Sequence, residues 1–255
     1  MVFLVATSLF ALGAIVASFV GVIVARLYTG QSFLVGRSKC DACGEELRTL
    51  SLIPILSYFA SHARSYCCGA RISAIAPLTE LLLGGLFVLA YLQTGLTIAL
   101  PFMLLSLSTL LALVLYDFTH QILPTPLLFV FIAFSAATGF LQAGSLAQFG
   151  DSLSMAALLG LLLAAIHFFS GGRAMGFADA PFVFGCSLLV GSAALSGFIF
   201  SFWIGAVVGI LVLARRPAGS RMGVEVPFAP FLAAGFLLSY FTQWNPFDLI
   251  STLLP

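Results

Sequence analysis

The sequence contains very little charge. Only 7% of its 255 residues are Asp, Glu, Lys or Arg, against about 25% in a typical soluble domain. Hydrophobic residues make up 61% of the chain, so a water-soluble fold would lack the polar side chains to cover its surface. The composition therefore predicts an all-α polytopic integral membrane protein. The formal net charge of +1 gives no information about partners. We expect a lipid bilayer around the chain and no nucleic acid as a partner.

The N-terminus lacks the basic region and the cleavage site of a secretory signal peptide. Residues 2–26 instead form one long apolar run, which we interpret as a retained first transmembrane helix. A spanning helix needs about 20 mainly apolar residues. On this basis the sequence predicts about eight transmembrane helices, at residues 2–26, 74–93, 97–116, 124–142, 152–169, 180–194, 197–214 and 228–243. Only the short segment GSAALSG separates the sixth from the seventh.

Lys and Arg are absent from every second loop of this topology. If the 27–73 segment is cytoplasmic, all ten basic residues fall on the cytoplasmic side, as the positive-inside rule requires. They are Arg26, Arg37, Lys39, Arg48, Arg64, Arg71, Arg173, Arg215, Arg216 and Arg221. The sequence thus predicts the orientation as well as the number of helices.

Two acids lie at ends of the predicted helices. Asp117 closes the third and Asp179 opens the sixth, so both lie at the cytoplasmic border in the predicted topology. An ionised carboxylate at bilayer depth costs a few kcal/mol, and such acids usually face a protein interior or water. Each acid could simply mark a helix end, with Asp179 as an N-cap. The glycines before Asp179, which permit close backbone approach, and the prolines after Asp117 favour a functional pair instead.

A pair of carboxyl groups in a partly dry site has a characteristic chemistry. Both cannot ionise easily, so one carboxylate activates a water molecule while the other, protonated, polarises a carbonyl group. This division of labour predicts an aspartyl protease.

Two motifs around these acids resemble known signatures. GFAD resembles the GxGD motif of membrane aspartyl proteases, with Gly176 and Asp179 in register and Ala178 replacing the second glycine. YDFTHQILPTPL resembles the D-x6-P-D element of type IV prepilin peptidases, with Asp117 in register and Thr125 replacing the second, non-catalytic acid.

Four further segments are similar to signatures of the prepilin peptidase family, in family order. They are GAIVASFVGVIVARL, IPILSYF, RISAIAPLTELL and VPFAPFLAAG, so the resemblance runs from about residue 13 to residue 235. The chain departs from the family at Ala229, which replaces a glycine, and at Pro181, where the family often has lysine.

The resemblance implies a multi-pass enzyme of the bacterial inner membrane that cuts the leader from type IV prepilin or pseudopilin precursors at the cytoplasmic face. Asp117 and Asp179 would be its catalytic residues, and proteolysis would need no cofactor. Three regions are then expected: a first helix at 1–26, a cytoplasmic cysteine loop at 27–73 and a transmembrane peptidase domain at 74–255. The alternative is a non-catalytic transporter or inactive assembly relative that uses the acids for ion coupling.

The predicted cytoplasmic loop carries four of the five cysteines, at Cys40, Cys43, Cys67 and Cys68. Two separated pairs suit a four-thiolate zinc site, and a reducing cytosol favours metal over disulfides. Longer prepilin peptidases carry C-x-x-C twice, and alignment with them places Ser65 at the third ligand position, with Cys67 as its substitute. A degraded or three-thiolate site is the alternative.

The resemblance also implies that this region takes part in methylating the new N-terminus from S-adenosylmethionine. The residues themselves show no pocket for that cofactor.

Four other residues have side chains that could take part in a functional site. Glu80, just inside the second predicted helix, either lines a water cavity or reaches toward the cytosol. We expect His120 at the surface, His167 at the membrane interface and Cys186 in the core.

Overall fold

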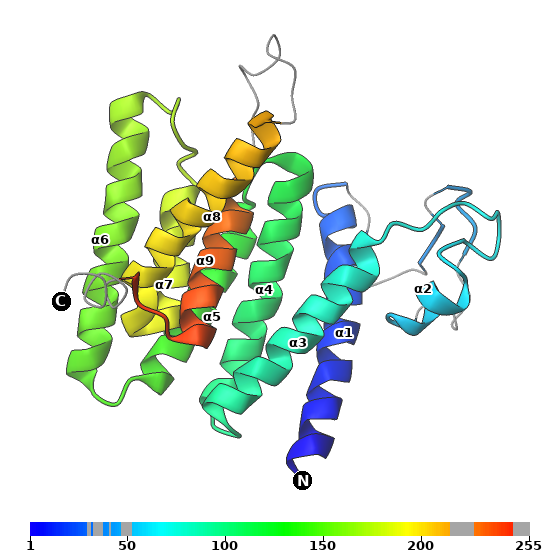
Figure 1. The fold of residues 1–255 in the computed structure, drawn as a ribbon, viewed down its shortest axis with the longest axis horizontal. Coiled ribbons are helices and arrows are strands. Elements are labelled where there is room, and N and C mark those ends of the chain that lie inside the picture. Colours follow the sequence, from blue (N-terminus) through cyan, green and yellow to red (C-terminus); the bar gives the residue numbers. More distant parts are fainter. Residues whose placement is uncertain (30–31, 33–37, 41, 47–52, 215–226, 247–255) are drawn as a thin grey trace. The chain divides into compact units, whose positions relative to one another are not determined.

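A computed structural model describes residues 1–29, 32, 38–40, 42–46, 53–214 and 227–246 of the chain (Figure 1). Within these ranges the regular structure is helical, with no strand and only two isolated β-bridges. The α-helices are α1 (Val2–Arg26), α2 (Leu56–Ala60), α3 (Ile75–Thr94), α4 (Ala99–His120), α5 (Thr125–Gln142), α6 (Leu146–Ser170), α7 (Asp179–Val190), α8 (Ala194–Ala214) and α9 (Ala229–Thr242). The predicted all-α fold is confirmed.

Each of the eight predicted transmembrane segments corresponds to a helix, but four boundaries differ by three or more residues. Helix α4 ends four residues later than predicted, at His120, and α8 starts three residues earlier, at Ala194. Helix α6 begins six residues before the predicted start at 152, because the Ser145 side chain accepts a hydrogen bond from the Gln148 N–H and caps the helix there. Helix α7 ends at Val190, four residues early, because Gly191 has a φ of 60° and breaks the helix.

Six helical runs among the described residues are long and apolar enough to cross a membrane, counting Asp179–Ala214 as one run. Its α7 part has 12 residues, about 18 Å at 1.5 Å per residue. The hydrocarbon core is about 30 Å thick, so α7 does not reach from one surface to the other. Backbone groups at an end of α7 therefore need partners within the protein.

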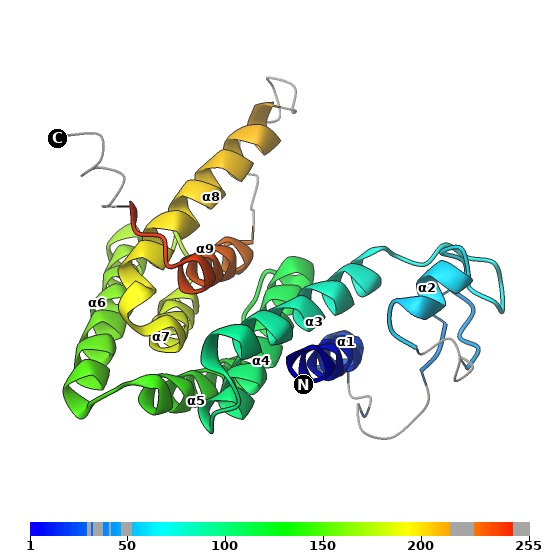
Figure 2. The same ribbon diagram turned by 60° about the horizontal axis from the view of Figure 1, so that its bottom comes forward.

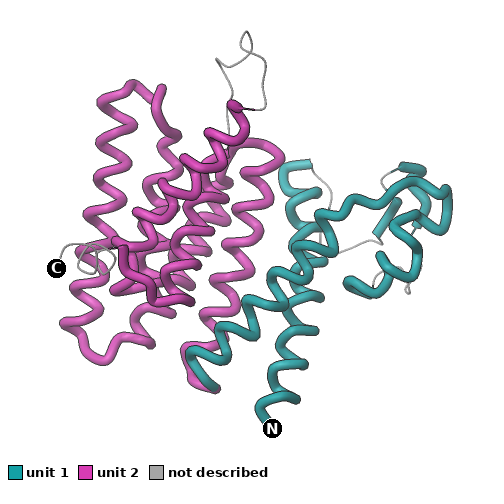
Figure 3. The backbone as a smooth tube through the Cα atoms, viewed as in Figure 1, with its two compact units in different colours: residues 1–95 teal, residues 96–255 magenta. Residues whose placement is uncertain are grey.

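The chain forms two compact units, Met1–Gly95 and Leu96–Pro255 (Figure 3). In the first unit α1 packs against α3, and the segment between them carries α2 and the cysteines. The two helices approach closely at Gly13 and Gly84, where a Cβ on either residue would meet the backbone of the other helix within 3 Å. Small residues commonly permit such close contact between membrane helices.

The second unit is built around α7, which packs against α5, α6, α8 and α9. Figure 2 shows α7 among α5, α6 and α9. Helix α4 packs against α5 and α9. The chain reverses direction at each turn, so the C-terminal end of α4 and the N-terminal ends of α7 and α9 lie at the same end of this unit. The two acids are therefore at one end of the bundle.

Helices α8 and α9 make the closest approach in the second unit. A Cβ on Gly235 of α9 would collide with the backbone and the side chain of Ser201 in α8. The Ser201 hydroxyl in turn donates to the Leu232 carbonyl at 3.1 Å. Only glycine at position 235 leaves room for this contact.

We expect Gly235→Ala to destabilise the protein by about 1–3 kcal/mol, the usual cost of overpacking a tight core. Gly209→Ala in α8 is the matched control, because a Cβ there meets nothing within 4 Å. Thermal unfolding of the two variants in detergent measures the difference. Equal unfolding temperatures for both variants would show that α8 and α9 do not pack as described.

Candidate functional site

Asp117 lies in the last turn of α4 and is buried, with 7% of its surface exposed. Its Oδ2 atom accepts a hydrogen bond of 3.2 Å from the Ala229 N–H at the start of α9. The helix continues past the predicted end at 116 to His120 and closes at Gln121, which adopts the left-handed conformation. Asp117 is thus held inside the bundle, with its carboxyl group against the N-terminus of another helix.

Asp179 is the first residue of α7. The N-cap position belongs to Ala178, and no side chain caps the helix, so the interpretation of Asp179 as an N-cap is wrong. The Asp179 N–H donates to the Gly176 carbonyl at 3.3 Å, and the Asp179 carboxyl group lies beside Gly176. Its side chain is partly exposed.

The two acids come from different helices, 62 residues apart in sequence, and lie close enough for their charges to interact. One is buried and fixed by a backbone donor, and the other is reachable from solvent. Acid–base hydrolysis uses two such carboxyl groups, one to activate a water molecule and one to polarise a carbonyl group.

The two alanines that replace family glycines sit in ordinary backbone conformations. Ala178 has φ −67° and ψ −18°, and Ala229 is the first residue of α9 and does not have a positive φ. An L-residue adopts these conformations without strain. The extra methyl groups therefore do not distort the backbone beside either acid.

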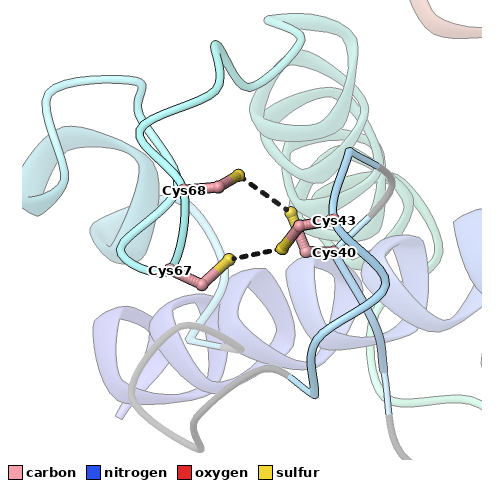
Figure 4. A group of neighbouring side chains, drawn as sticks. All are labelled: Cys40, Cys43, Cys67 and Cys68. Atoms are coloured by element: carbon pink, nitrogen blue, oxygen red, sulfur yellow. Dashed lines mark hydrogen bonds between the residues drawn. The ribbon is translucent and has the colours of Figure 1, made fainter.

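The four loop cysteines meet in one cluster (Figure 4). Their sulfur atoms all lie within 4.8 Å of one another. The Sγ atoms of Cys43 and Cys67 are 3.3 Å apart, and those of Cys40 and Cys68 are 3.8 Å apart. The side chains of the two pairs point toward each other, an arrangement that can bind a metal ion.

The cluster is built from two turns with the same backbone bonds, 25 residues apart. In the first, the Cys40 N–H donates to the Glu45 carbonyl and the Gly44 N–H to the Cys40 carbonyl, both at 2.8 Å. In the second, the Ser65 N–H donates to the Ala70 carbonyl and the Gly69 N–H to the Ser65 carbonyl, again at 2.8 Å.

The flanking residues of each turn pair in the same way. A β-bridge joins Lys39 to Glu46 around the first turn and Arg64 to Arg71 around the second. Gly44 and Gly69 both have positive φ, 74° and 71°. The two turns are thus equivalent, with Ser65 in the position of Cys40, Cys68 in that of Cys43 and Cys67 in that of Ala42.

Ser65 lies beside two of the sulfur atoms. Its hydroxyl is 2.9 Å from the Cys67 Sγ and 3.4 Å from the Cys40 Sγ. The Ser65 hydroxyl and the backbone around Cys43 lower the pKa of Cys40 to about 6. The Glu45 backbone lowers the pKa of Cys43, but the Cys67 thiol and partial burial outweigh it and raise that pKa to about 12.

The structure places Glu80, His120 and Cys186 in ordinary structural environments. The buried Glu80 accepts a hydrogen bond of 2.6 Å from the Ile55 N–H, which fixes a residue with positive φ just before α2. Exposed His120 stacks on Tyr116, with ring centres 4.2 Å apart. Cys186 is buried in α7, as expected.

Sequence reasoning did not predict the role of Ala229. Its signal is present in VPFAPF, because a proline near a helix start marks an N-terminus whose first N–H groups have no partner within the helix. In the predicted topology that N-terminus shares a face with Asp117. Together these two facts identify the N–H groups there as donors for the acid.

Comparison with known proteins matches the chain to one domain model and to several relatives that share one name. Residues 11–94 match the model of the Bacterial Peptidase A24 N-terminal domain. The chain is 30% identical over 238 residues to the prepilin leader peptidase/N-methyltransferase of Bacillus subtilis, covering 91% of this chain and 92% of that one. It is 36% identical to the protein of the same name from Myxococcus xanthus, covering 86% of this chain and 66% of the relative. The comparison with solved structures found no match.

Proposed function

The chain belongs to the prepilin leader peptidase/N-methyltransferase family, and we propose that it is a membrane aspartyl endopeptidase that removes the leader peptide of type IV prepilin-like precursors. The observation that carries the proposal is the placement of Asp117 and Asp179, from different helices, at one end of the second unit, close enough for their charges to interact. The names of the relatives supply the substrate class. The predicted peptidase domain, residues 74–255, contains both acids.

The proposed reaction uses the two carboxyl groups in complementary protonation states. The carboxylate takes a proton from a water molecule, whose oxygen attacks the scissile carbonyl carbon. The protonated acid donates its proton to the carbonyl oxygen, giving a tetrahedral diol. Collapse of the diol breaks the C–N bond as a carboxyl group returns a proton to the leaving amine. The Ala229 N–H keeps Asp117 in place throughout, and partly exposed Asp179 faces the entering water and substrate.

The protein is a multi-pass membrane protein, and we propose the bacterial inner membrane with the acids at the cytoplasmic face. Among described residues, Arg173 supports this orientation, because it lies in the loop between α6 and α7, at the same end as both acids. In the first unit, Arg26 is the last residue of α1, and Lys39, Arg64 and Arg71 lie in the segment between α1 and α3. Arg37, Arg48, Arg215, Arg216 and Arg221 lie outside the described residues.

Replacing either acid removes one of the two proton carriers. We expect Asp117→Asn and Asp179→Asn each to lower prepilin cleavage by more than about 1,000-fold, as for other residues that act as a catalytic unit. Coexpression with a tagged prepilin, followed by mass spectrometry of the product, measures the cleavage and its position.

Asp151→Asn is the control, because Asp151 is an exposed acid of α6 far from these helix ends in sequence. It should leave cleavage unchanged. Full processing by either active-site variant would reject the assigned pair. A wild-type protein that cleaves no prepilin would favour the non-catalytic alternative.

We propose further that the cysteine cluster holds a structural zinc ion through Cys40, Cys43, Cys67 and Cys68. Four sulfurs bound tetrahedrally to zinc at about 2.3 Å would lie roughly 3.8 Å apart. The sulfur separations of 3.3 and 3.8 Å are close to that value, and the thiols are not joined in disulfides. When bound, zinc would cross-link the two equivalent turns of the cysteine segment.

The equivalence of the turns gives a sharp test of which sulfurs bind zinc. We expect Cys67→Ala to weaken zinc binding by more than about 100-fold, since losses outside the ligand shell already cost about 10- to 100-fold. Adding Ser65→Cys to Cys67→Ala should restore binding, because position 65 is equivalent to Cys40. Zinc content and the thiolate-to-metal absorption of the cobalt-substituted protein are the measurements.

Cys186→Ala is the matched control, since this buried thiol lies in the second unit, outside the cluster. A wild-type protein without zinc would reject the metal site itself. Unchanged binding in Cys67→Ala would instead assign the fourth ligand elsewhere.

The names of the relatives also carry an N-methyltransferase activity, which we propose for this chain with S-adenosylmethionine as the methyl donor. The described residues do not outline a site for that cofactor, so no catalytic step is assigned to them. The mass spectrum of the cleaved product also reports a methyl group on the new N-terminus.

A further inference from the structure

His167 lies in the last turn of α6, three residues before the helix ends at Ser170, and is only partly exposed. Its Nδ1 atom is 2.9 Å from the Met175 carbonyl oxygen. A carbonyl oxygen only accepts hydrogen bonds, so this contact assigns the proton to Nδ1. The imidazole therefore donates to the loop that leads from α6 to Asp179.

The imidazole ring is held in place on three sides. Its centre lies 5.5 Å from the ring centres of Phe168 and Phe177. A Cβ on Gly172, which has a φ of 75°, would lie 3.3 Å from the ring. The Gly172 N–H also donates to the His167 carbonyl at 2.9 Å. The ring thus has one position, between the end of the helix and the returning loop.

The Met175 carbonyl and the Gly176 N–H belong to the same planar peptide unit. On one side of that unit, His167 holds the carbonyl oxygen. On the other side, Gly176 lies against the Asp179 carboxyl group, because a Cβ on Gly176 would lie 3.5 Å from the Asp179 Oδ2, and the Gly176 carbonyl accepts from the Asp179 N–H at 3.3 Å. Because the unit is planar, fixing the oxygen also fixes the direction of the N–H.

We propose that His167 is a positioning residue for Asp179, acting through the Met175–Gly176 peptide unit. It does not touch the reacting atoms. It sets the orientation of the peptide unit that lies against the Asp179 carboxyl group. The loop lies at the start of the short helix α7.

The proposal predicts a specific pattern among substitutions of His167. The amide nitrogen of asparagine takes nearly the place of a histidine Nδ1, so His167→Asn should keep the bond to Met175. His167→Gln places its amide one methylene too far, and His167→Leu has no donor. We expect His167→Gln and His167→Leu to lower kcat for prepilin cleavage by about 10- to 100-fold, as misplacement of a catalytic group does, with KM little changed. His167→Asn should stay close to wild type.

The cleavage readout rests on the proposed peptidase activity, so a second readout is independent of it. Hydrogen exchange at the Asp179 amide, which donates to the Gly176 carbonyl, should be slow in the wild type and in His167→Asn when followed by mass spectrometry. In His167→Gln and His167→Leu it should be faster by about tenfold, the scale of one hydrogen bond. His120→Leu, an exposed histidine at the same end of the second unit, is the control for both readouts.

The outcomes separate the two proposals. If the wild type cleaves no prepilin, the peptidase proposal fails, and the exchange pattern alone supports or overturns the role of His167. If His167→Leu shows wild-type hydrogen exchange and wild-type cleavage, or if His167→Asn is as impaired as His167→Leu, His167 does not position Asp179. Thermal unfolding of each variant identifies a loss that comes from misfolding, and exchange measured below that transition still decides.

Discussion

The hydrogen bond between the Ala229 N–H and the Asp117 carboxyl group satisfies two groups that an apolar bundle cannot leave unpaired. The first N–H groups of a helix have no acceptor within it, and a buried carboxyl group needs a donor. Here each supplies the other, across 112 residues of sequence. The late VPFAPF segment thus belongs to the site, because its helix start faces the acid.

The second acid depends on packing more than on a single bond. Helix α7 is buried along most of its length, and its neighbours α5, α6, α8 and α9 surround it. Asp179 is its first residue, so a rigid core element fixes the Cα position of the acid. The loop before it then has only to orient the side chain, and Gly176 of that loop lies against the Asp179 carboxyl group. A rigid helix and a held loop together give a defined geometry at a partly exposed position.

The sequence was sufficient to predict the helices and the placement of both acids at one end of the bundle, because apolar length and isolated charges are strong signals in a chain with so few charges. Boundaries were harder to predict. The segment before 152 looked like a loop because it is polar, yet the Ser145 cap extends α6 through it. The hydrogen bonds of the Ala229 N–H to Asp117 and of His167 to the Met175 carbonyl were not predicted, since both involve backbone groups of distant or looping segments. A residue pattern records side chains and does not show which peptide groups they meet.

The cysteine segment also shows that residue spacing alone does not determine which side chains meet. By spacing alone, Cys67 and Cys68 look too close for a tetrahedral site, and Ser65 looks like a lost ligand. The equivalence of the two turns changes that interpretation. Both turns close with the same pair of backbone bonds, so the chain reverses direction between residues 65 and 70.

The Cys67 sulfur reaches Cys43 while the Cys68 sulfur reaches Cys40. The hydroxyl of Ser65 stays within hydrogen-bond distance of both sulfurs nearest to it. Four sulfurs therefore converge although the regular spacing is gone, because the backbone of the turn determines which side chains meet.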